Sequence, residues 1–549
     1  MRSPCSWKGF FVVIVLFAFG SVLTFGCGDA SATGSQTSQS FVPVWAGYYP
    51  SPFPSAQEHS LSLRSFLDVN RFNYLDDQGN STWAKLKSLN PAIQIYVYEA
   101  PAQIYSSQDN LTNYPSAVGL NTIARYDQAR PLSNPYPVGN LDRNNPGFFL
   151  FDSNGNRITD SVYGFYYLDQ GNPAFAIYWL GSVYSDIITQ PWKADGIYVD
   201  GPGFALPSLP ANSAKYPTDA AWATASLTFM QVVTTGLHLY GQKVWFNASS
   251  TNTAVGQSSW EIADAWADPP DVLMDEGAFA VKWGCSGSVS TINVVSVGAP
   301  GSNYQVGDVL TITQSGASGG KVTVSSIGSG GTVAGMSLTA QGTGYSAASA
   351  LSVSGGHGSG CTVDVGVGYC MVQIYPEAQC KSSIDTMQGV SHVRAAIESH
   401  CLGSPGSSGL DNYGNPLTYW DAVYFALSCF LLGKNTVANN SYFYWWDTAL
   451  PASSGLLWLN EYGINLGSAV GTYQVTPYGS SNVYWRQFQN GYVYVNLSNN
   501  DVNGIVLPAS FRQVTHSNVQ NPFGDPTINT LNLPAHRAAI LLNSSVTSW

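Results

Sequence analysis

The sequence predicts an α/β fold, a (β/α)8 TIM barrel with an inserted small all-β module and a C-terminal antiparallel β-sandwich domain. Three observations predict it. Eight short apolar segments alternate with helical stretches, the pattern of parallel strands joined by crossover helices. A Gly- and Ser-rich stretch at 286–368 interrupts the alternation. From residue 473 onward, short alternating segments indicate antiparallel strands.

The eight candidate strands are rich in Val, Ile, Tyr and Phe. They lie at residues 42–49, 69–75, 93–99, 196–200, 244–247, 272–276, 393–398 and 442–446. The helices between them have recognisable ends: Asn172 is an N-cap before Pro173, and Gly433 is expected just after the apolar helix at 419–432. Eight strands of this kind predict a closed barrel over residues 41–472.

The stretch at 286–368 contains an internal near-repeat. Gly301-Ser302-Asn303-Tyr304 is echoed by Gly342-Thr343-Gly344-Tyr345, and Val- and Thr-rich strands after glycine pairs recur at a similar offset of about forty residues. Cys285 and Cys370 flank the stretch and are able to clip its base together. We therefore expect a small β-module, serving for binding or as a spacer, and a separate C-terminal β domain over residues 473–549.

The first 32 residues predict an export signal. A basic start precedes an uncharged apolar run at 10–25, and Ala30-Ser31-Ala32 fits a cleavage site. A second interpretation is a lipoprotein signal that ends at Cys27. The apolar run is shorter than the ~20 residues that a spanning helix needs. We expect an exported protein, extracellular or held at the cell envelope by a lipid on Cys27, with residues 33–40 as a polar linker.

Composition limits the classes of partner. Of the 549 residues, 44% are apolar and only 10% are charged, against ~25% charged in average proteins, and 32 are Tyr and 16 Trp. A net charge of -12 argues against nucleic acid, whose phosphates are bound by Lys and Arg. The scattered His and the absence of any CxxC pair predict no metal or cofactor. We expect a monomer that acts on a carbohydrate and meets a membrane only if Cys27 is lipidated.

Catalysis in a barrel of this kind takes place at the carboxyl ends of the strands. The segment from Asp195 to Gly201 has an apolar middle, so Asp200 falls at the carboxyl end of a buried strand, with Gly201 and Gly203 leaving room for a ligand. A carboxylate in this place is able to act as a nucleophile or to stabilise an oxocarbenium ion. Asp200 is therefore the first catalytic candidate.

The sixth strand ends in two adjacent carboxylates, Asp275 and Glu276. Neighbouring residues of a strand point to opposite faces, so at most one of the two faces the barrel mouth. We favour Glu276 as the proton donor, because its longer side chain reaches further and a neighbouring carboxylate helps to raise its pKa. Asp275 is the alternative donor.

Other strand ends carry polar or aromatic residues that suit substrate binding. Asn247 is able to bond a sugar hydroxyl, and Trp446 is able to stack on a sugar ring. Glu99 and Glu398 end the third and seventh strands and are further candidates for substrate binding. Asp169, which precedes the Asn172 cap, is interpreted as structural.

Several segments together resemble the glycosyl hydrolase-like family 15, a group of (β/α)8-barrel proteins with a C-terminal β domain. They are Tyr167–Pro173, Asp195–Gly201, Val272–Gly277, Leu459-Asn460-Glu461-Tyr462 with Leu466-Gly467, and Tyr484–Gly491. The resemblance implies sugar hydrolysis, with the fourth-strand Asp of the family matching Asp200 and a sixth-strand acid matching Glu276. The inserted module departs from the family pattern and leaves the shape of the substrate cleft open.

The leading hypothesis is a glycoside hydrolase that cleaves O-glycosidic bonds of a polysaccharide or oligosaccharide by carboxylate acid/base chemistry. The alternatives are a non-catalytic glycan-binding protein and a surface- or phage-associated adhesion protein on the same scaffold. The arrangement of Asp200 and Glu276 discriminates between them: carboxyl groups roughly 5 to 10 Å apart in one cleft support hydrolysis, and carboxyl groups that point apart favour binding alone.

Overall fold

The computed structural model describes residues 42–548, with gaps at 48–62, 69–86, 106–145, 159–164, 185–187, 189–193, 205–212, 283–284, 286–290, 436–440 and 448–458 and at positions 89, 100, 102, 202 and 369. The predicted export signal with Cys27 and the linker at 33–40 lie outside the described residues. In the part that is described, no helix is both long and apolar enough to cross a membrane.

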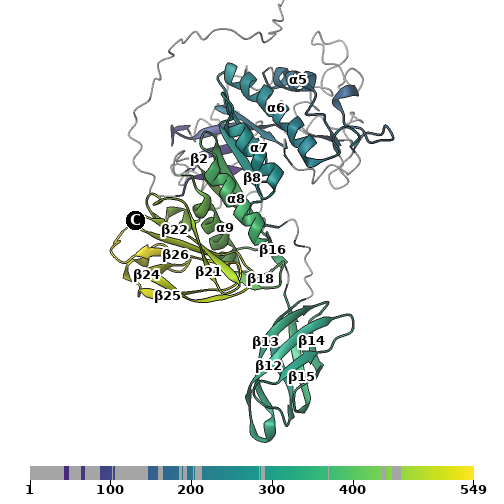
Figure 1. Ribbon diagram of the computed structural model, residues 1–549, viewed down its shortest axis with the longest axis vertical. Coiled ribbons are helices and arrows are strands. Elements are labelled where there is room, and N and C mark those ends of the chain that lie inside the picture. Colours follow the sequence, from purple (N-terminus) through teal and green to yellow (C-terminus); the bar gives the residue numbers. More distant parts are fainter. Residues whose placement is uncertain are drawn as a thin grey trace, which may run out of the picture. The chain divides into compact units, whose positions relative to one another are not determined.

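Eight parallel strands form the central sheet, and two of them, β2 and β8, are labelled in Figure 1. The eight strands are β1 (Val44–Gly47), β2 (Leu63–Asp68), β3 (Gln94–Glu99), β6 (Gly196–Asp200), β7 (Lys243–Asn247), β8 (Val272–Glu276), β17 (Arg394–Cys401) and β20 (Tyr442–Asp447). Each strand pairs with the next in this order, and the ring closes where Val44 of β1 lies opposite Phe443 of β20. The predicted mixed α/β fold with a curled parallel sheet is confirmed.

The second strand differs from the prediction. The structure has β2 at Leu63–Asp68, paired with β1 on one side and β3 on the other, whereas the expected segment at 69–75 lies outside the described residues. Arg64 and Asp68 make this strand less apolar than its neighbours, so a search for apolar runs passes over it. Main-chain pairing with two strands overrides this weak local signal.

Five α-helices are described beside this sheet: α5 (Pro173–Val183), α6 (Asp219–Leu239), α7 (Ala254–Asp264), α8 (Glu377–Gly389) and α9 (Tyr419–Gly433). The predicted cap of α5 is present, because the Asn172 side chain accepts a hydrogen bond from the backbone N–H of Ala174. Helix α9 begins with a capping box between Thr418 and Asp421. Most of the chain that connects β1 to β3 falls in the gaps, apart from residues 87–88 and 90–93, so the five helices named here are those that follow β3.

The sequence predicts that Gly433 follows the last residue of α9, but in the structure Gly433 is itself the last residue of the helix. A Cβ atom at this position would lie 2.9 Å from Sδ of Met387 on α8 and 3.2 Å from the Ile384 carbonyl oxygen. The glycine is therefore needed for the close approach of α8 and α9, and not for a left-handed turn.

Large aromatic side chains fill the space enclosed by the ring of parallel strands. The Trp245 ring centroid lies 5.4 Å from that of Trp45, 5.2 Å from that of Tyr96 and 5.8 Å from that of Tyr442. All four side chains are buried. Packing of this kind excludes water below the carboxyl ends of the strands and lowers the local dielectric there.

The inserted segment forms a six-stranded sheet between β9 (Ala280–Val281) and β16 (Cys370–Ile374). Its strands are β10 (Ile292–Ser302), β11 (Val309–Ile312), β12 (Ser318–Ile327), β13 (Val333–Thr343), β14 (Ala348–Ser354) and β15 (Ser359–Val367). Their order in the sheet is β10-β15-β14-β11-β12-β13. A disulfide joins Cys285 to Cys370, the pair that flanks the module.

The near-repeat is visible in the geometry of this module. Gly301 and Gly342 adopt φ values of 60° and 62°. The hydroxyl oxygen of buried Tyr304 accepts from the N–H of Cys361, and that of buried Tyr345 accepts from the N–H of Gly320. Strands β10 to β12 recur as β13 to β15 after about forty residues. The two halves exchange their first strands, because β10 of the first half pairs with β15 of the second, and β13 of the second half pairs with β12 of the first.

The C-terminal segment forms one antiparallel sheet of six strands, where the sequence predicts a sandwich of two sheets. The strands are β21 (Gln474–Tyr478), β22 (Ser481–Phe488), β23 (Gly491–Asn496), β24 (Val502–Val514), β25 (Ile528–Leu533) and β26 (Arg537–Asn543). The long strand β24 pairs with β25 through its first part and with β26 through its last residues, with register shifts between. This shared strand makes the sheet continuous.

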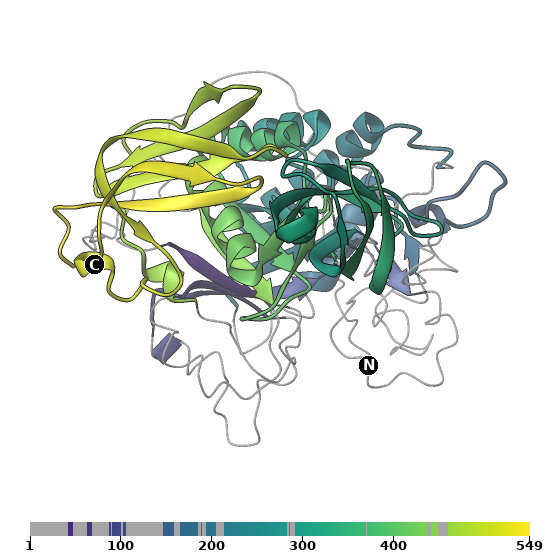
Figure 2. The ribbon, with the colours of Figure 1, turned by 90° about the horizontal axis from the view of Figure 1, so that it is seen from below.

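The C-terminal sheet packs on α9 (Figures 1 and 2), and a buried arginine connects the two. Arg486 on β22 is 2% exposed and donates hydrogen bonds to the carbonyl oxygens of Leu431, Leu432 and Lys434 at 3.0, 2.9 and 2.6 Å. These carbonyls belong to the last turn of α9, where no helical partner remains and the helix dipole is negative. Burial lowers the pKa of Arg486 to about 10.

We expect Arg486→Met to lower the free energy of unfolding by about 3 kcal/mol, because buried carbonyls lose charged donors that the thioether does not replace. Arg512→Met is the matched control: Arg512 donates to two carbonyls of the C-terminal tail, Ser544 and Val546, and this change should cost under about 1 kcal/mol. Chemical denaturation of both variants measures the difference. An equal loss of unfolding free energy in the two variants would mean that Arg486 stabilises the fold no more than Arg512 does.

Candidate active site

The carboxyl ends of the fourth, fifth and sixth strands of the ring bring three predicted residues together. The Asn247 amide nitrogen donates to Oδ1 of Asp200 at 2.8 Å and to Oε2 of Glu276 at 2.6 Å. Because both oxygens bond the same nitrogen, they are at most about 5.4 Å apart. The hydroxyl of Ser249 donates to the Asn247 amide oxygen at 3.0 Å and fixes the orientation of the amide.

Local backbone geometry explains why both carboxylates stand at strand ends. Each is followed directly by a glycine, and Gly201 and Gly277 both adopt φ of 96°. A residue with a Cβ atom would be strained at either position. The chain therefore turns sharply after Asp200 and after Glu276, and both side chains remain partly exposed above the buried strands.

Two tyrosines complete this side of the site. The Tyr98 hydroxyl on β3 donates a short hydrogen bond to Oδ2 of Asp200. Tyr198 lies two residues before Asp200 on the same face of β6, and its ring centroid is 5.6 Å from that of Tyr98. Burial, together with the charges of Asp200 and Glu276, raises the pKa of Tyr198. Tyr198 thus presents a neutral hydroxyl below the two carboxylates.

Asp275 points away from this group. Its Oδ2 accepts from the backbone N–H of Thr251 at 3.1 Å and from the Thr251 hydroxyl, whose oxygen lies 2.8 Å from the Ser383 hydroxyl on α8. Asp275 is 4% exposed, so it lies in the layer between strands and helices. Of the two neighbouring carboxylates, Glu276 is the one that faces Asp200.

Glu398 is a third carboxylate at this end of the strands. It registers directly with Glu276 on the neighbouring strand and is 5% exposed. Lys282, shortly after β8, is close enough to interact electrostatically with both Glu276 and Glu398. The described part of the site therefore carries three acidic groups against this lysine. No group of three His, Cys, Asp or Glu residues among the described positions has a metal-binding arrangement.

Burial raises the pKa values of all three acids, Asp200, Glu276 and Glu398. Burial, and then the charge of Asp200, raises the pKa of Glu276 to about 7, although the Asn247 hydrogen bond opposes the shift. Burial and the charges of Glu276 and Asp200 raise the pKa of Glu398 well above its ordinary value. Burial also raises the pKa of Asp200, and the hydrogen bonds from Tyr98 and Asn247 stabilise its ionised form. The hydrogen bonds from Tyr98 and Asn247 favour Asp200 as the group that ionises first.

Of the two other predicted binding residues, Glu99 is not brought into this group, and the position of the Trp446 side chain is not described. Glu99 registers with Val199 and so lies on the opposite face of the sheet from Tyr98 and Asp200. Trp446 lies on β20 opposite His400, but its side chain is outside the described part of the structure. Asp169, interpreted as structural, accepts from the Tyr216 hydroxyl at 2.6 Å and from Lys215 at 2.5 Å, as a buried brace.

The sequence analysis assigned no role in the site to Tyr98, Ser249 or Gln170. Strand alternation contained the signal for Tyr98, because residues 98 and 99 point to opposite faces and only one of them reaches the site. Gln170 donates to the carbonyl oxygen of Gly201 at 3.1 Å and accepts from the Ser226 hydroxyl at 3.0 Å. It thereby supports the turn after Asp200 from a distant part of the chain, which no local pattern reveals.

One family model matches part of this chain. Residues 87–282 match the model of the hypothetical glycosyl hydrolase family 15. The matched region contains Tyr98, Asp200, Asn247 and Glu276, and the resemblance identified from the sequence is confirmed; Glu398 lies beyond it. A search of curated protein sequences returned no match.

Solved structures give distant likenesses. Isomaltulose synthase from Klebsiella sp. LX3 is 10% identical with a TM-score of 0.40, covering 91% of this chain and 98% of that chain. A noncanonical maltogenic α-amylase from Thermotoga neapolitana is 9% identical with a TM-score of 0.35, covering 91% and 98%. The α-galactosidase AgaA from Geobacillus stearothermophilus is 9% identical with a TM-score of 0.36, covering 91% and 55%.

Proposed function

We propose that this protein is a (β/α)8-barrel glycoside hydrolase that cleaves O-glycosidic bonds of a polysaccharide or oligosaccharide with Asp200 and Glu276 as its catalytic carboxylates. One observation carries the proposal: the Asn247 amide holds both carboxylates in a partly exposed site at the carboxyl ends of neighbouring strands. The nearest oxygens are close enough to flank one glycosidic bond. Two carboxylates that face one cleft at this separation favour hydrolysis over binding alone.

Each acid has a distinct role in the proposed reaction. Glu276, whose pKa is raised to about 7, is about half protonated at neutral pH and in that form gives its proton to the leaving sugar oxygen. Asp200, held by Tyr98 and Asn247, is ionised and attacks the anomeric carbon or stabilises the positive charge that develops there. The short separation favours the first of these, a covalent intermediate, and so net retention of anomeric configuration.

We assign Glu398 to substrate binding, as a protonated acid that donates to a sugar hydroxyl. Asn247 acts as the residue that positions both carboxylates, and Trp446 as a stacking surface at the eighth strand. Glu99 receives no role in the site. We also propose that the protein is exported by its N-terminal signal, with residues 41–472 as the catalytic domain and 473–549 as the C-terminal β domain.

The proposed donor makes activity depend on pH. Glu276 must be protonated to act, so kcat/KM on substrates with poor leaving groups should fall as pH rises through about 7. The apparent value belongs to the coupled acids together. A pH profile on an unactivated oligosaccharide, compared with an aryl glycoside that needs less protonation, measures this limb. A profile that stays flat to pH 9 on both substrates would exclude Glu276 as the donor.

A panel of polysaccharides and oligosaccharides tests the function itself. Purified protein should release reducing sugar from at least one member, and nuclear magnetic resonance of the first product should show the retained anomer. The non-catalytic alternative, a glycan-binding or adhesion protein, gives binding to a member of the panel with no release of sugar by the wild-type protein. The double variant Asp200→Asn/Glu276→Gln provides the blank.

A further inference from the structure

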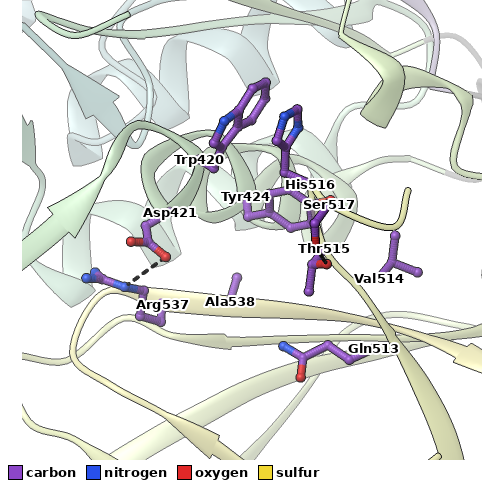
Figure 3. A pocket seen from close by; sticks show the side chains of 10 residues that line it. All are labelled: Trp420, Asp421, Tyr424, Gln513, Val514, Thr515, His516, Ser517, Arg537 and Ala538. Atoms are coloured by element: carbon purple, nitrogen blue, oxygen red, sulfur yellow. Dashed lines mark hydrogen bonds and ion pairs between the residues drawn. The ribbon is translucent and has the colours of Figure 1, made fainter. Parts of the chain in front are cut away.

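A cavity of about 370 Å³ lies between α9 and the C-terminal sheet, apart from the three carboxylates (Figure 3). Trp420, Asp421 and Tyr424 line it from the first turns of α9, and residues 513–517 and Arg537 line it from β24, the segment after it and β26. Its volume is within the ~300–1,000 Å³ of small-molecule sites. We propose that this cavity is a second carbohydrate-binding site, which holds a sugar unit of a polymeric chain.

One side of the cavity is an aromatic wall that is fixed in place. The rings of Trp420 and His516 stack with centroids 3.3 Å apart and 10° between their planes. Nδ1 of His516 lies 2.9 Å from Oε1 of Glu461, whose side chain is fully buried. The buried carboxylate therefore sets the orientation of the imidazole, and the imidazole sets that of the indole. A rigid aromatic surface suits the apolar face of a sugar ring at little entropic cost.

The remaining lining offers hydrogen-bonding groups of the kind that bind sugar hydroxyls. Arg537 pairs with Asp421 across the cavity, with Nε 3.3 Å from Oδ1 (Figure 3). The side-chain amide of Gln513, on β24, makes no hydrogen bond to another described residue. Thr515 and Ser517 hydroxyls lie 3.0 Å from each other. An ion pair, an amide and two hydroxyls beside an aromatic wall are suited to a neutral sugar rather than to a purely apolar ligand.

The position of the cavity connects it to the proposed chemistry. Helix α9 follows β17 and returns toward the start of β20, so its first turn lies at the same end of the parallel strands as Glu398. A polysaccharide bound near the carboxylates is thus on the same end of the barrel as Trp420. The inference rests on the proposed function for its class of ligand, and its test has a binding readout of its own.

The test uses affinity electrophoresis of the full-length protein in native gels that contain amylopectin, galactomannan or xylan. With Asp200→Asn as background, so that the polymer is not consumed, at least one polysaccharide should slow migration. Adding Trp420→Ala should weaken this retardation about tenfold in apparent affinity. Ser517→Trp, which fills the cavity from an exposed position and removes no packing, should do the same. Tyr240→Ala, at an exposed aromatic residue after α6, should change nothing.

The outcomes separate this inference from the proposed function. Retardation by none of the three polymers, or equal retardation of the cavity variants and the Tyr240→Ala control, would overturn the second site. Retardation that depends on Trp420 in a protein whose wild type cleaves nothing would overturn the hydrolase and leave the site standing. For an active enzyme, kcat/KM of Ser517→Trp should fall several-fold on polymer and stay unchanged on a short aryl glycoside.

Discussion

Replacing Asp200 with Asn should lower kcat on a validated substrate by on the order of 10³-fold or more. The amide keeps the shape of the side chain and one oxygen that accepts from Asn247, with its nitrogen beside the Tyr98 hydroxyl, but it removes the negative charge that faces the anomeric carbon. The melting temperature should change little, because the residue is partly exposed at the end of its strand. Steady-state kinetics and calorimetry on the same preparation check both expectations.

The outcome would count against the assignment if Asp200→Asn kept near-normal turnover with an unchanged melting temperature. Glu398→Gln is the informative companion, since Glu398 is the third acid of the site and is assigned to binding. It should raise KM more than it lowers kcat. A larger loss of kcat in Glu398→Gln than in Asp200→Asn would mean that Glu398 is the catalytic carboxylate and that Asp200 serves substrate binding.

Replacing Glu276 with Gln should lower turnover about 10²–10⁴-fold on unactivated sugars, the range that general acid catalysis supplies. The loss should shrink on aryl glycosides with good leaving groups, because those need little protonation. The high-pH limb near pH 7 should disappear with the titrating group. Comparing kcat/KM across a series of leaving groups measures the first two effects, and a pH profile of the variant measures the third.

The neighbouring carboxylate provides a matched control for this experiment. Asp275→Asn changes the same charge one residue away, but Asp275 bonds Thr251 in the layer behind the strands. This variant should lose stability and keep the turnover of the folded fraction. If Asp275→Asn abolished activity and Glu276→Gln did not, Asp275 would be the donor.

Apart from β2, the parallel strands were predictable because each is a short, mostly apolar run, and the fourth to eighth strands lie where the sequence indicates. Placing side chains on faces was harder. The sequence offered only side-chain length and an expected pKa to choose Glu276 over Asp275 as the residue that faces the site. On the third strand it favoured Glu99 over Tyr98, and Glu99 lies on the face of the sheet away from Asp200. A one-residue difference reverses the face of a side chain, and only the pairing register fixes it.

Contacts between distant segments lay beyond the sequence for a different reason. The support of Gly201 by Gln170 and the connection of Arg486 to the end of α9 join residues that no local pattern relates. The C-terminal strands show the same limit. Their alternation indicates strands with one inward face, but it does not say that β24 joins all six into one sheet.

The strand exchange in the inserted module has a practical consequence. Because its first strand pairs with its last, with Ile292 opposite Val367, the chain enters and leaves the module through neighbouring strands roughly 5 Å apart. The two segments that receive it, β9 and β16, are themselves paired. The junction is therefore a natural grafting point: a foreign domain whose ends lie side by side, such as a reporter or a module that recognises another polymer, has the geometry to replace residues 291–368 without altering the strands on either side.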